Sequence, residues 1–220
     1  MKIIFFGDSI TDASRARGSN DAGRVHETYS DTPRAYGSGY VCFAAAELFY
    51  EKPHYYEILN RGIGGDRLPQ IYARINLDVW SENPDVLSIL IGANDVNTGS
   101  NPNCTDLERW GRLYRMLIRD TQERFPNIKL MICEPFSLRD AQAADENHPF
   151  NTIHDYAAEA KKVAEEFNLP FVALQDKMDE AVKIYGVEAV CYDRVHPNLV
   201  GSKVIAAEWL RVFREHYGNC

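Results

Sequence analysis

Short apolar runs alternate along this chain with longer stretches in which apolar residues recur every three or four positions. The short runs predict five buried strands, at Lys2–Phe6, Tyr56–Leu59, Val86–Ile91, Lys129–Cys133 and Phe171–Leu174. The longer stretches predict helices, at Tyr40–Tyr50, Leu68–Trp80, Leu107–Phe125, Ile153–Phe167, Lys177–Tyr185 and Ser202–His216. Apolar strands separated by helices indicate a parallel sheet covered on both faces. We therefore expect a flavodoxin-like α/β fold, a three-layer sandwich around a five-stranded parallel sheet.

We expect one domain, spanning residues 1–220. The chain has no linker rich in proline, glycine or serine, no internal repeat and no low-complexity tract. Three long irregular stretches, 13–39, 97–105 and 136–152, lie between the predicted elements, and loops of that length are uncommon unless they serve a function. Because ligands in this fold bind beyond the carboxyl ends of the strands, chemistry is expected in the residues that follow each strand.

Composition and charge exclude several classes of protein and partner. Hydrophobic residues make up 45% and charged residues 25%, as in a soluble globular protein, and the net charge of −8 argues against nucleic acid or an anionic membrane as the main partner. The first apolar run is too short for a signal peptide, and no stretch approaches a transmembrane helix. The five cysteines and six histidines show no disulfide or metal-ligand spacing. We expect a cytoplasmic protein that needs neither a metal ion nor a cofactor. The sequence leaves open whether it is a monomer or a homo-oligomer.

Three segments that follow the first three strands contain candidate chemistry. After the first strand, the glycine of Gly7-Asp8-Ser9 permits a sharp turn that leaves the Ser9 hydroxyl facing the crevice. The glycine-rich turn Asn60–Asp66 offers backbone N–H groups to an anion, and Asn94 offers a side-chain amide to a developing oxyanion. In isolation each segment is more often a helix cap or a turn.

A fourth segment, near the end of the chain, pairs an acid with a histidine. His196 follows Asp193 by three residues, so one ring nitrogen can face that carboxylate while the other faces the crevice. Pro197 restricts His196 to extended conformations, which favours a rigid loop. Such a pair alone is more often an ordinary surface loop. Together, however, serine, glycine, asparagine and Asp-x-x-His occupy the strand ends of one α/β sheet in a fixed order.

This order resembles the SGNH (GDSL) hydrolase superfamily. Its four motif blocks match G-D-S-I at 7–10, G-I-G-G-D at 62–66, G-A-N-D at 92–95 and D-R-V-H-P at 193–197. The resemblance spans nearly the whole chain and implies the SGNH hydrolase fold and a serine esterase. It implies that Ser9 is the nucleophile, His196 the general base and Asp193 the partner that orients the histidine.

The same resemblance implies an oxyanion hole, which stabilises negative charge on the substrate carbonyl oxygen. Its donors are expected to be the backbone N–H groups of Ser9 and Gly65 and the side-chain amide of Asn94. Within the glycine cluster, Gly65 is the position that matches by counting from Asn60.

A narrower resemblance concerns the substrate. Five segments look like those of intracellular acetylxylan esterases: 7–12, 37–41, 61–63, 91–96 and 193–197. This chain departs from them around Gly65, where Gly64 and Asp66 stand near positions at which the esterases tend to carry serine and asparagine. Tyr192 stands where they tend to carry tryptophan. Asp8 and Tyr192 are expected to contact the substrate.

Three functions remain open at this point. The first is an esterase that removes acetyl groups from short carbohydrates such as xylo-oligosaccharides, through an acyl-enzyme. A lysophospholipase or thioesterase would use the same chemistry with a long apolar groove, and a non-catalytic binding module would lack the nucleophile or the base. Polar and aromatic residues in the first irregular stretch favour a sugar: Asp21, Arg24, Tyr29, Asp31 and Tyr36.

Overall fold

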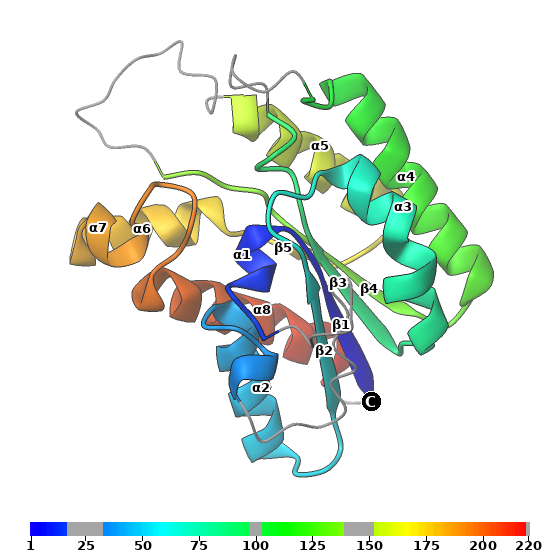
Figure 1. The fold of residues 1–220 in the computed structure, drawn as a ribbon, viewed down its shortest axis with the longest axis horizontal. Helices are drawn as coiled ribbons and strands as arrows, with labels where there is room; N and C mark the ends of the chain where they lie inside the picture. The colour runs from blue at the N-terminus through cyan, green and yellow to red at the C-terminus, as the bar shows by residue number, and fades with distance from the viewer. Residues whose placement is uncertain (17–32, 97–102, 139–151, 219–220) are drawn as a thin grey trace.

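A five-stranded parallel sheet forms the centre of the molecule (Figure 1). The computed structural model describes residues 1–16, 33–96, 103–138 and 152–218. The strands are β1 (Lys2–Gly7), β2 (Glu57–Gly62), β3 (Val86–Leu90), β4 (Lys129–Cys133) and β5 (Phe171–Val172). Their order is β2-β1-β3-β4-β5 and every neighbouring pair is parallel, which is the flavodoxin-like order. The predicted α/β fold is confirmed.

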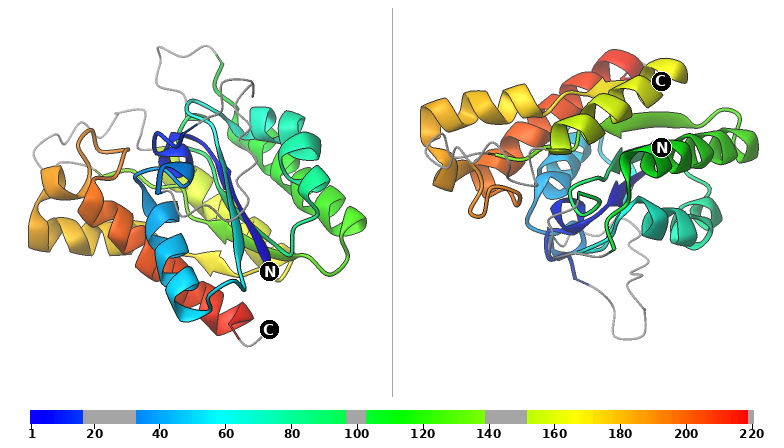
Figure 2. Two further views of the ribbon diagram at one scale, coloured as in Figure 1. Left: turned by 60° about the horizontal axis from the view of Figure 1, so that its bottom comes forward. Right: turned by 90° about the horizontal axis from the view of Figure 1, so that it is seen from above.

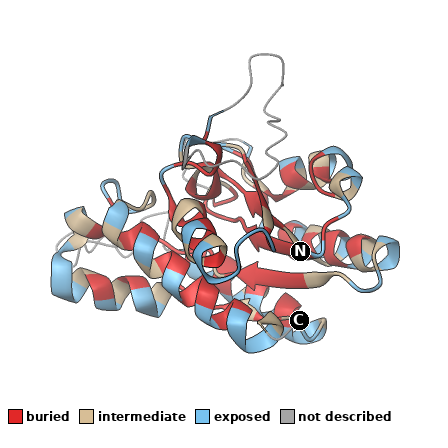
Figure 3. Ribbon diagram, turned by 90° about the horizontal axis from the view of Figure 1, so that it is seen from below, coloured by how far each residue is buried: buried red, intermediate tan, exposed pale blue. Residues whose placement is uncertain are grey.

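Helices cover both faces of this sheet because its strands are apolar on both sides. Alternate residues of β1 point to opposite faces, so Ile3 and Phe5 join one core while Ile4 and Phe6 join the other. The first core is closed by α2 (Tyr40–Glu51), α6 (Gln175–Tyr185) and α8 (Leu199–Tyr217), and the second by α3 (Leu68–Asp78), α4 (Leu107–Arg124) and α5 (Ile153–Glu166). Figure 2 shows α2 beside α8, and Figure 3 shows the buried residues along the sheet and the inner helix faces.

Four short elements lack an apolar repeat, and the sequence does not predict them. They are the helices α1 (Ser9–Asp12) and α7 (Val187–Val190) and the 3₁₀ turns Pro33–Ala35 and Trp80–Glu82. α6 begins two residues before its predicted start, and β5 is shorter than predicted. The cause is Glu134, whose carboxylate accepts the N–H groups of Leu174 and Gln175 and so begins the helix there.

Some residues that the sequence analysis singled out lie outside the described part of the chain. Most of the three irregular stretches, with Asp21, Arg24, Tyr29 and Asp31, lies outside it. Tyr36 is described; it is 3% exposed and packs against Phe49, so this residue gives no support to a sugar ligand. Across the helices that the structure describes, none combines the length and apolar character needed to cross a membrane.

Candidate active site

Ser9 is the first residue of the helix that follows β1. Gly7 ends the strand where β1 and β3 approach closely, and a Cβ at this position would lie 2.2 Å from the Leu90 carbonyl oxygen. Asp8 then caps α1, because its Oδ1 accepts the Ile10 N–H at 3.0 Å. This sharp strand-to-helix turn places Ser9 at the carboxyl edge of the sheet, as the sequence predicts.

Ser9, His196 and Asp193 form one hydrogen-bonded chain. Ser9 Oγ lies 2.7 Å from His196 Nε2, and His196 Nδ1 lies 2.6 Å from Asp193 Oδ2. The other carboxylate oxygen, Asp193 Oδ1, accepts the backbone N–H groups of His196 at 2.7 Å and Val195 at 3.1 Å. The loop therefore folds around the aspartate, which holds both the backbone and the ring of the histidine.

These hydrogen bonds also determine the charge of Asp193. Partial burial acts to raise the pKa of this carboxyl, but the hydrogen bonds from the His196 N–H, the His196 ring and the Val195 N–H outweigh it. The pKa of Asp193 is lowered below its ordinary value of 3.8. Asp193 is consequently ionised at neutral pH and stabilises a proton on the imidazole.

The glycine-rich turn between β2 and α3 lies beside Ser9. A Cβ built on Gly64 would lie 3.8 Å from Ser9 Cβ, and the Gly64 N–H donates to Asp12 Oδ2 at 3.2 Å. Gly65 adopts a positive φ of 86°, in the left-handed region that favours glycine. Within the described part of the chain, neither the Ser9 N–H nor the Gly65 N–H donates to a protein acceptor.

Asn94 is bound to the same turn. Its Nδ2 donates to the Asp66 carbonyl oxygen at 3.0 Å, and that bond uses one of the two amide hydrogens. The next residue, Asp95, is buried and accepts the Leu68 N–H with both carboxylate oxygens, at 3.2 and 3.1 Å. Burial is the main reason that the pKa of Asp95 rises to about 6, and a hydrogen bond from Thr105 opposes it.

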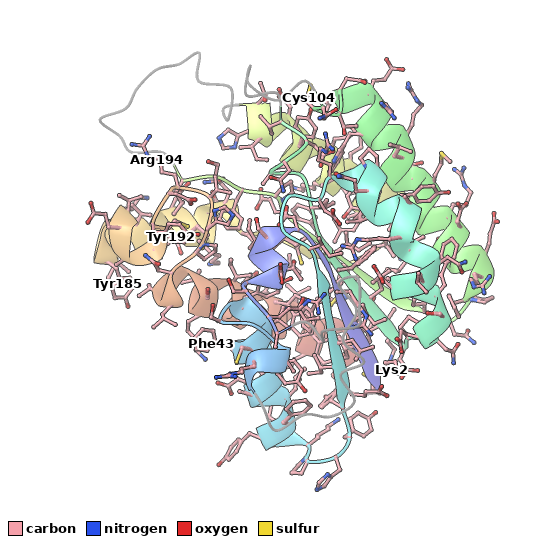
Figure 4. All side chains as sticks on the ribbon, in the orientation of Figure 1. Lys2, Phe43, Cys104, Tyr185, Tyr192 and Arg194 are labelled. Atoms are coloured by element: carbon pink, nitrogen blue, oxygen red, sulfur yellow. The ribbon has the colours of Figure 1, made fainter. Side chains whose placement is uncertain are left out.

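The two residues expected to contact substrate have different surroundings. Tyr192 is 65% exposed, and its ring stacks on the His196 ring with centroids 5.7 Å apart and an interplanar angle of 14°. Figure 4 shows it on the segment that leads into α8. Asp8 is only 1% exposed, and its carboxylate serves the helix cap. The structure therefore corrects the expectation for Asp8, which lies beneath the surface.

Two arginines hold the glycine-rich turn, and sequence reasoning missed both. Arg74 Nε donates to Asp66 Oδ2 at 2.7 Å, and its Nη2 donates to the Gly7 carbonyl oxygen at 3.1 Å. Arg15 Nε donates to the Gly62 carbonyl oxygen at 3.2 Å. Arg74 is four residues before Asp78 on one helix, a pairing that the sequence could have suggested. The hydrogen bond from Arg74 to the Gly7 carbonyl oxygen cannot be inferred from the neighbouring sequence, because it joins residues 67 positions apart.

The described residues include no cluster of three histidine, cysteine, aspartate or glutamate side chains that could hold a metal ion. The arrangement offers instead a hydroxyl bonded to an imidazole, an ionised carboxylate behind the imidazole, and backbone and amide donors on the adjacent turn. These groups are those that acyl transfer through a serine requires.

Comparison with known families agrees with this chemistry. A family model described as GDSL-like lipase/acylhydrolase matches residues 5–204. The chain belongs to that family. Its members are carboxylic ester hydrolases, so the chain belongs to a family of enzymes whose substrates are esters.

Relatives with known structures share this fold along nearly their whole length. An acetylxylan esterase from Geobacillus stearothermophilus is 32% identical over 217 residues, covering 96% of this chain and 92% of the relative. Its crystal structure matches with a TM-score of 0.80, covering 96% of this chain and 93% of that one. A protein from Parabacteroides merdae described as a GDSL-like lipase is 36% identical, with a TM-score of 0.86 and coverage of 96% and 94%.

Proposed function

We propose that this chain is a serine esterase that works through an acyl-enzyme. The observation that carries the proposal is the hydrogen-bonded chain from Ser9 Oγ through the His196 ring to Asp193. Among the solved structures of the acetylxylan esterase are catalytic mutants in which a serine or an aspartate is replaced by alanine. Those two residue types are the ones that Ser9 and Asp193 supply here.

The reaction proceeds in two halves. Ser9 Oγ attacks the ester carbonyl carbon while His196 Nε2 takes its proton, and the resulting imidazolium gives that proton to the leaving oxygen as the ester C–O bond breaks. Water then attacks the acyl-enzyme with His196 again acting as base, which releases the acid and restores Ser9. Asp193 stabilises the imidazolium in both halves, because it stays ionised.

The carbonyl oxygen becomes negative in each tetrahedral intermediate. The Ser9 N–H and the Gly65 N–H are the proposed backbone donors, and the second amide hydrogen of Asn94 is the third. Because the first amide hydrogen is fixed on Asp66, the Asn94 side chain is oriented before substrate binds. This preorganisation lowers the barrier without a cost of rearrangement during the reaction.

For the substrate, we propose acetyl esters of carbohydrates such as xylo-oligosaccharides. The support is the 32% identity to an acetylxylan esterase and the similarity to structures of an acetyl-xylooligosaccharide esterase. The exposed ring of Tyr192 beside His196 gives a further reason, because an aromatic face packs against the apolar face of a sugar ring.

The experiment compares kcat/KM for acetyl, butyryl and octanoyl esters of one leaving alcohol, using the wild type and Ser9→Ala. We expect the acetyl ester to be hydrolysed fastest by the wild type, and Ser9→Ala to lose about 10⁴- to 10⁶-fold in turnover. Ser81→Ala is the matched control, because it changes an exposed serine whose hydroxyl donates to the carbonyl oxygen of Leu77, near the end of α3. Rates that climb with chain length would favour a lipase or thioesterase, and an active Ser9→Ala would overturn the mechanism.

A further inference from the structure

A cavity of about 310 Å³ opens beside the Ser9–His196 pair. Both residues line it, together with the end of α1, the residues just before α2 and the first turn of α8. Gly65 and Asn94, the proposed oxyanion donors, do not line it. The cavity therefore lies on the histidine side of the nucleophile.

That position decides which half of an ester the cavity can hold. In the tetrahedral intermediate the carbonyl oxygen faces the oxyanion donors, whereas the leaving oxygen has to lie within reach of the His196 Nε2 proton. The group attached to the leaving oxygen consequently extends along the histidine side. We propose that this cavity binds the leaving alcohol, and that the alcohol is a saccharide unit with several free hydroxyl groups. The proposal rests on the proposed function and adds to it the place and chemistry of the alcohol site.

The polar lining supports a hydroxylated ligand. Three serines line the cavity from three different segments, Ser14, Ser38 and Ser202, and Ser202 is the most buried of them at 2% exposed. The Ser14 and Ser202 hydroxyls can each donate and accept, whereas the Ser38 hydroxyl donates to the Ala13 carbonyl oxygen and offers a ligand only its acceptor sites. Together they match the mixed donors and acceptors of a sugar. An alkyl chain in the same place would remove these hydroxyls from water without replacing their hydrogen bonds, which is unfavourable.

The wall that carries Ser14 is held in an unusual backbone conformation. Ala13 and Ser14 both have positive φ, 44° and 59°, although neither is a glycine. The Ala13 carbonyl oxygen accepts two bonds from Ser38, from its N–H at 2.8 Å and its Oγ at 3.1 Å. A Cβ on Gly39 would lie 2.6 Å from Ala13 Cβ, so the two segments touch. Strained backbone of this kind persists where its surroundings hold it and is concentrated at functional sites.

The Tyr192 ring and the volume of the cavity indicate the shape and size of ligand that the cavity can hold. The Tyr192 ring lines the cavity and is 65% exposed, so one of its faces is open to a ligand while the ring stacks on His196. A volume of about 310 Å³ is at the lower end of the range for small-molecule sites. The cavity therefore suits a short saccharide, and any longer chain would extend into solvent.

The test compares two acetyl esters that differ only in their alcohol, an acetylated xyloside and 4-nitrophenyl acetate. The measured quantity is the ratio of their kcat/KM values. We expect Ser14→Ala to lower this ratio about three- to tenfold, the effect of one lost hydrogen bond, and Ser14→Ala/Ser202→Ala to lower it further. Ser14→Gly removes the same hydroxyl and relieves the backbone, so it should behave like Ser14→Ala if the hydroxyl is what matters. Ser81→Ala is the control, and its ratio should equal that of the wild type.

Two results would overturn the alcohol site. One is an unchanged ratio in Ser14→Ala, Ser14→Gly and the double variant, with folding verified by thermal unfolding. The other is a changed preference between acetyl and butyryl esters of 4-nitrophenol in these variants, because that would place the acyl group in the cavity. A failure of the proposed function looks different: the wild type itself would hydrolyse neither ester.

Discussion

Asp8 lies directly before the proposed nucleophile and is a buried acid. Burial is the main reason that its pKa rises from 3.8 to about 7, and the hydrogen bond from the Ile10 N–H opposes that rise. The nearby carboxyls of Asp95 and Asp66 raise the pKa further, while His196 lowers it. Asp8 therefore keeps its proton in the folded protein over a pH range in which the unfolded chain loses it.

The first prediction concerns this carboxyl and stability. Between pH 4 and 7 the folded state binds more protons at Asp8 than the unfolded state, so the contribution of Asp8 to stability falls as pH rises through that window. Asp8→Asn keeps the acceptor for the Ile10 N–H and has no proton to lose. We expect Asp8→Asn to gain free energy of unfolding relative to the wild type at pH 8, by up to about 4 kcal/mol, and much less at pH 4. Urea unfolding at both pH values checks this, and an equal difference at both would contradict it.

The second prediction separates catalysis from binding at Asn94. Its side-chain amide is expected to donate to the carbonyl oxygen only when that oxygen carries charge, so the contact acts mainly in the transition state. Asn94→Ala should lower kcat about 10²- to 10³-fold with a small change in KM. Steady-state kinetics on an aryl acetate provide the measurement. A raised KM with kcat retained would make Asn94 a substrate-binding residue instead.

The turn between β2 and α3 depends on other elements for its shape. Arg74 from α3 joins the side chain of Asp66, beside Gly65, to the carbonyl of Gly7, the last residue of β1. The Asp66 carbonyl in turn holds Asn94. One arginine thus connects the end of the strand that precedes Ser9 with the turn that carries Gly65, one of the proposed oxyanion donors.

We therefore expect Arg74→Met to reduce kcat about 10- to 100-fold and to change KM less, because small displacements of reacting groups are costly. Arg115→Met is a matched control. Arg115 also pairs with two carboxylates, Glu159 and Glu166, and its side chain is 20% exposed compared with 16% for Arg74. Both variants should lose stability, and only Arg74→Met should lose turnover. Equal kcat values in the two variants, compared well below their unfolding temperatures, would remove the positioning role of Arg74.

At the scale of the whole molecule, the sheet could be predicted because its strands are buried on both faces. The predicted bounds of the fourth strand are those of β4, and β1 extends the first predicted strand by Gly7 alone. The second strand was predicted to end at Leu59, but β2 continues through Asn60 and Arg61. These polar residues are buried because the Asn60 amide donates to the Thr11 and Tyr36 carbonyls and Arg61 pairs with Glu82.

The start of α8 shows a second limit of the pattern. The apolar repeat predicts a start at Ser202, whereas the helix begins at Leu199. The Asn198 carbonyl oxygen already accepts the Ser202 N–H, and Leu199 is 69% exposed, so the helix begins before the buried apolar repeat that predicts it. In the candidate site the strand-end residues are predictable from sequence, since each follows an apolar run. The contacts of Arg74 with Gly7 are not, because they join residues that only the folded sheet brings together.

The most direct measurement of the central claim is to identify the residue that carries the acyl group. The wild-type protein is mixed with excess 4-nitrophenyl acetate and quenched in acid within the first turnover, and its peptides are mapped by mass spectrometry. The account predicts an acetyl group on Ser9, formed at a rate no slower than steady-state turnover. Turnover without an acetylated Ser9 peptide, or with acetylation at another residue at the catalytic rate, would contradict it.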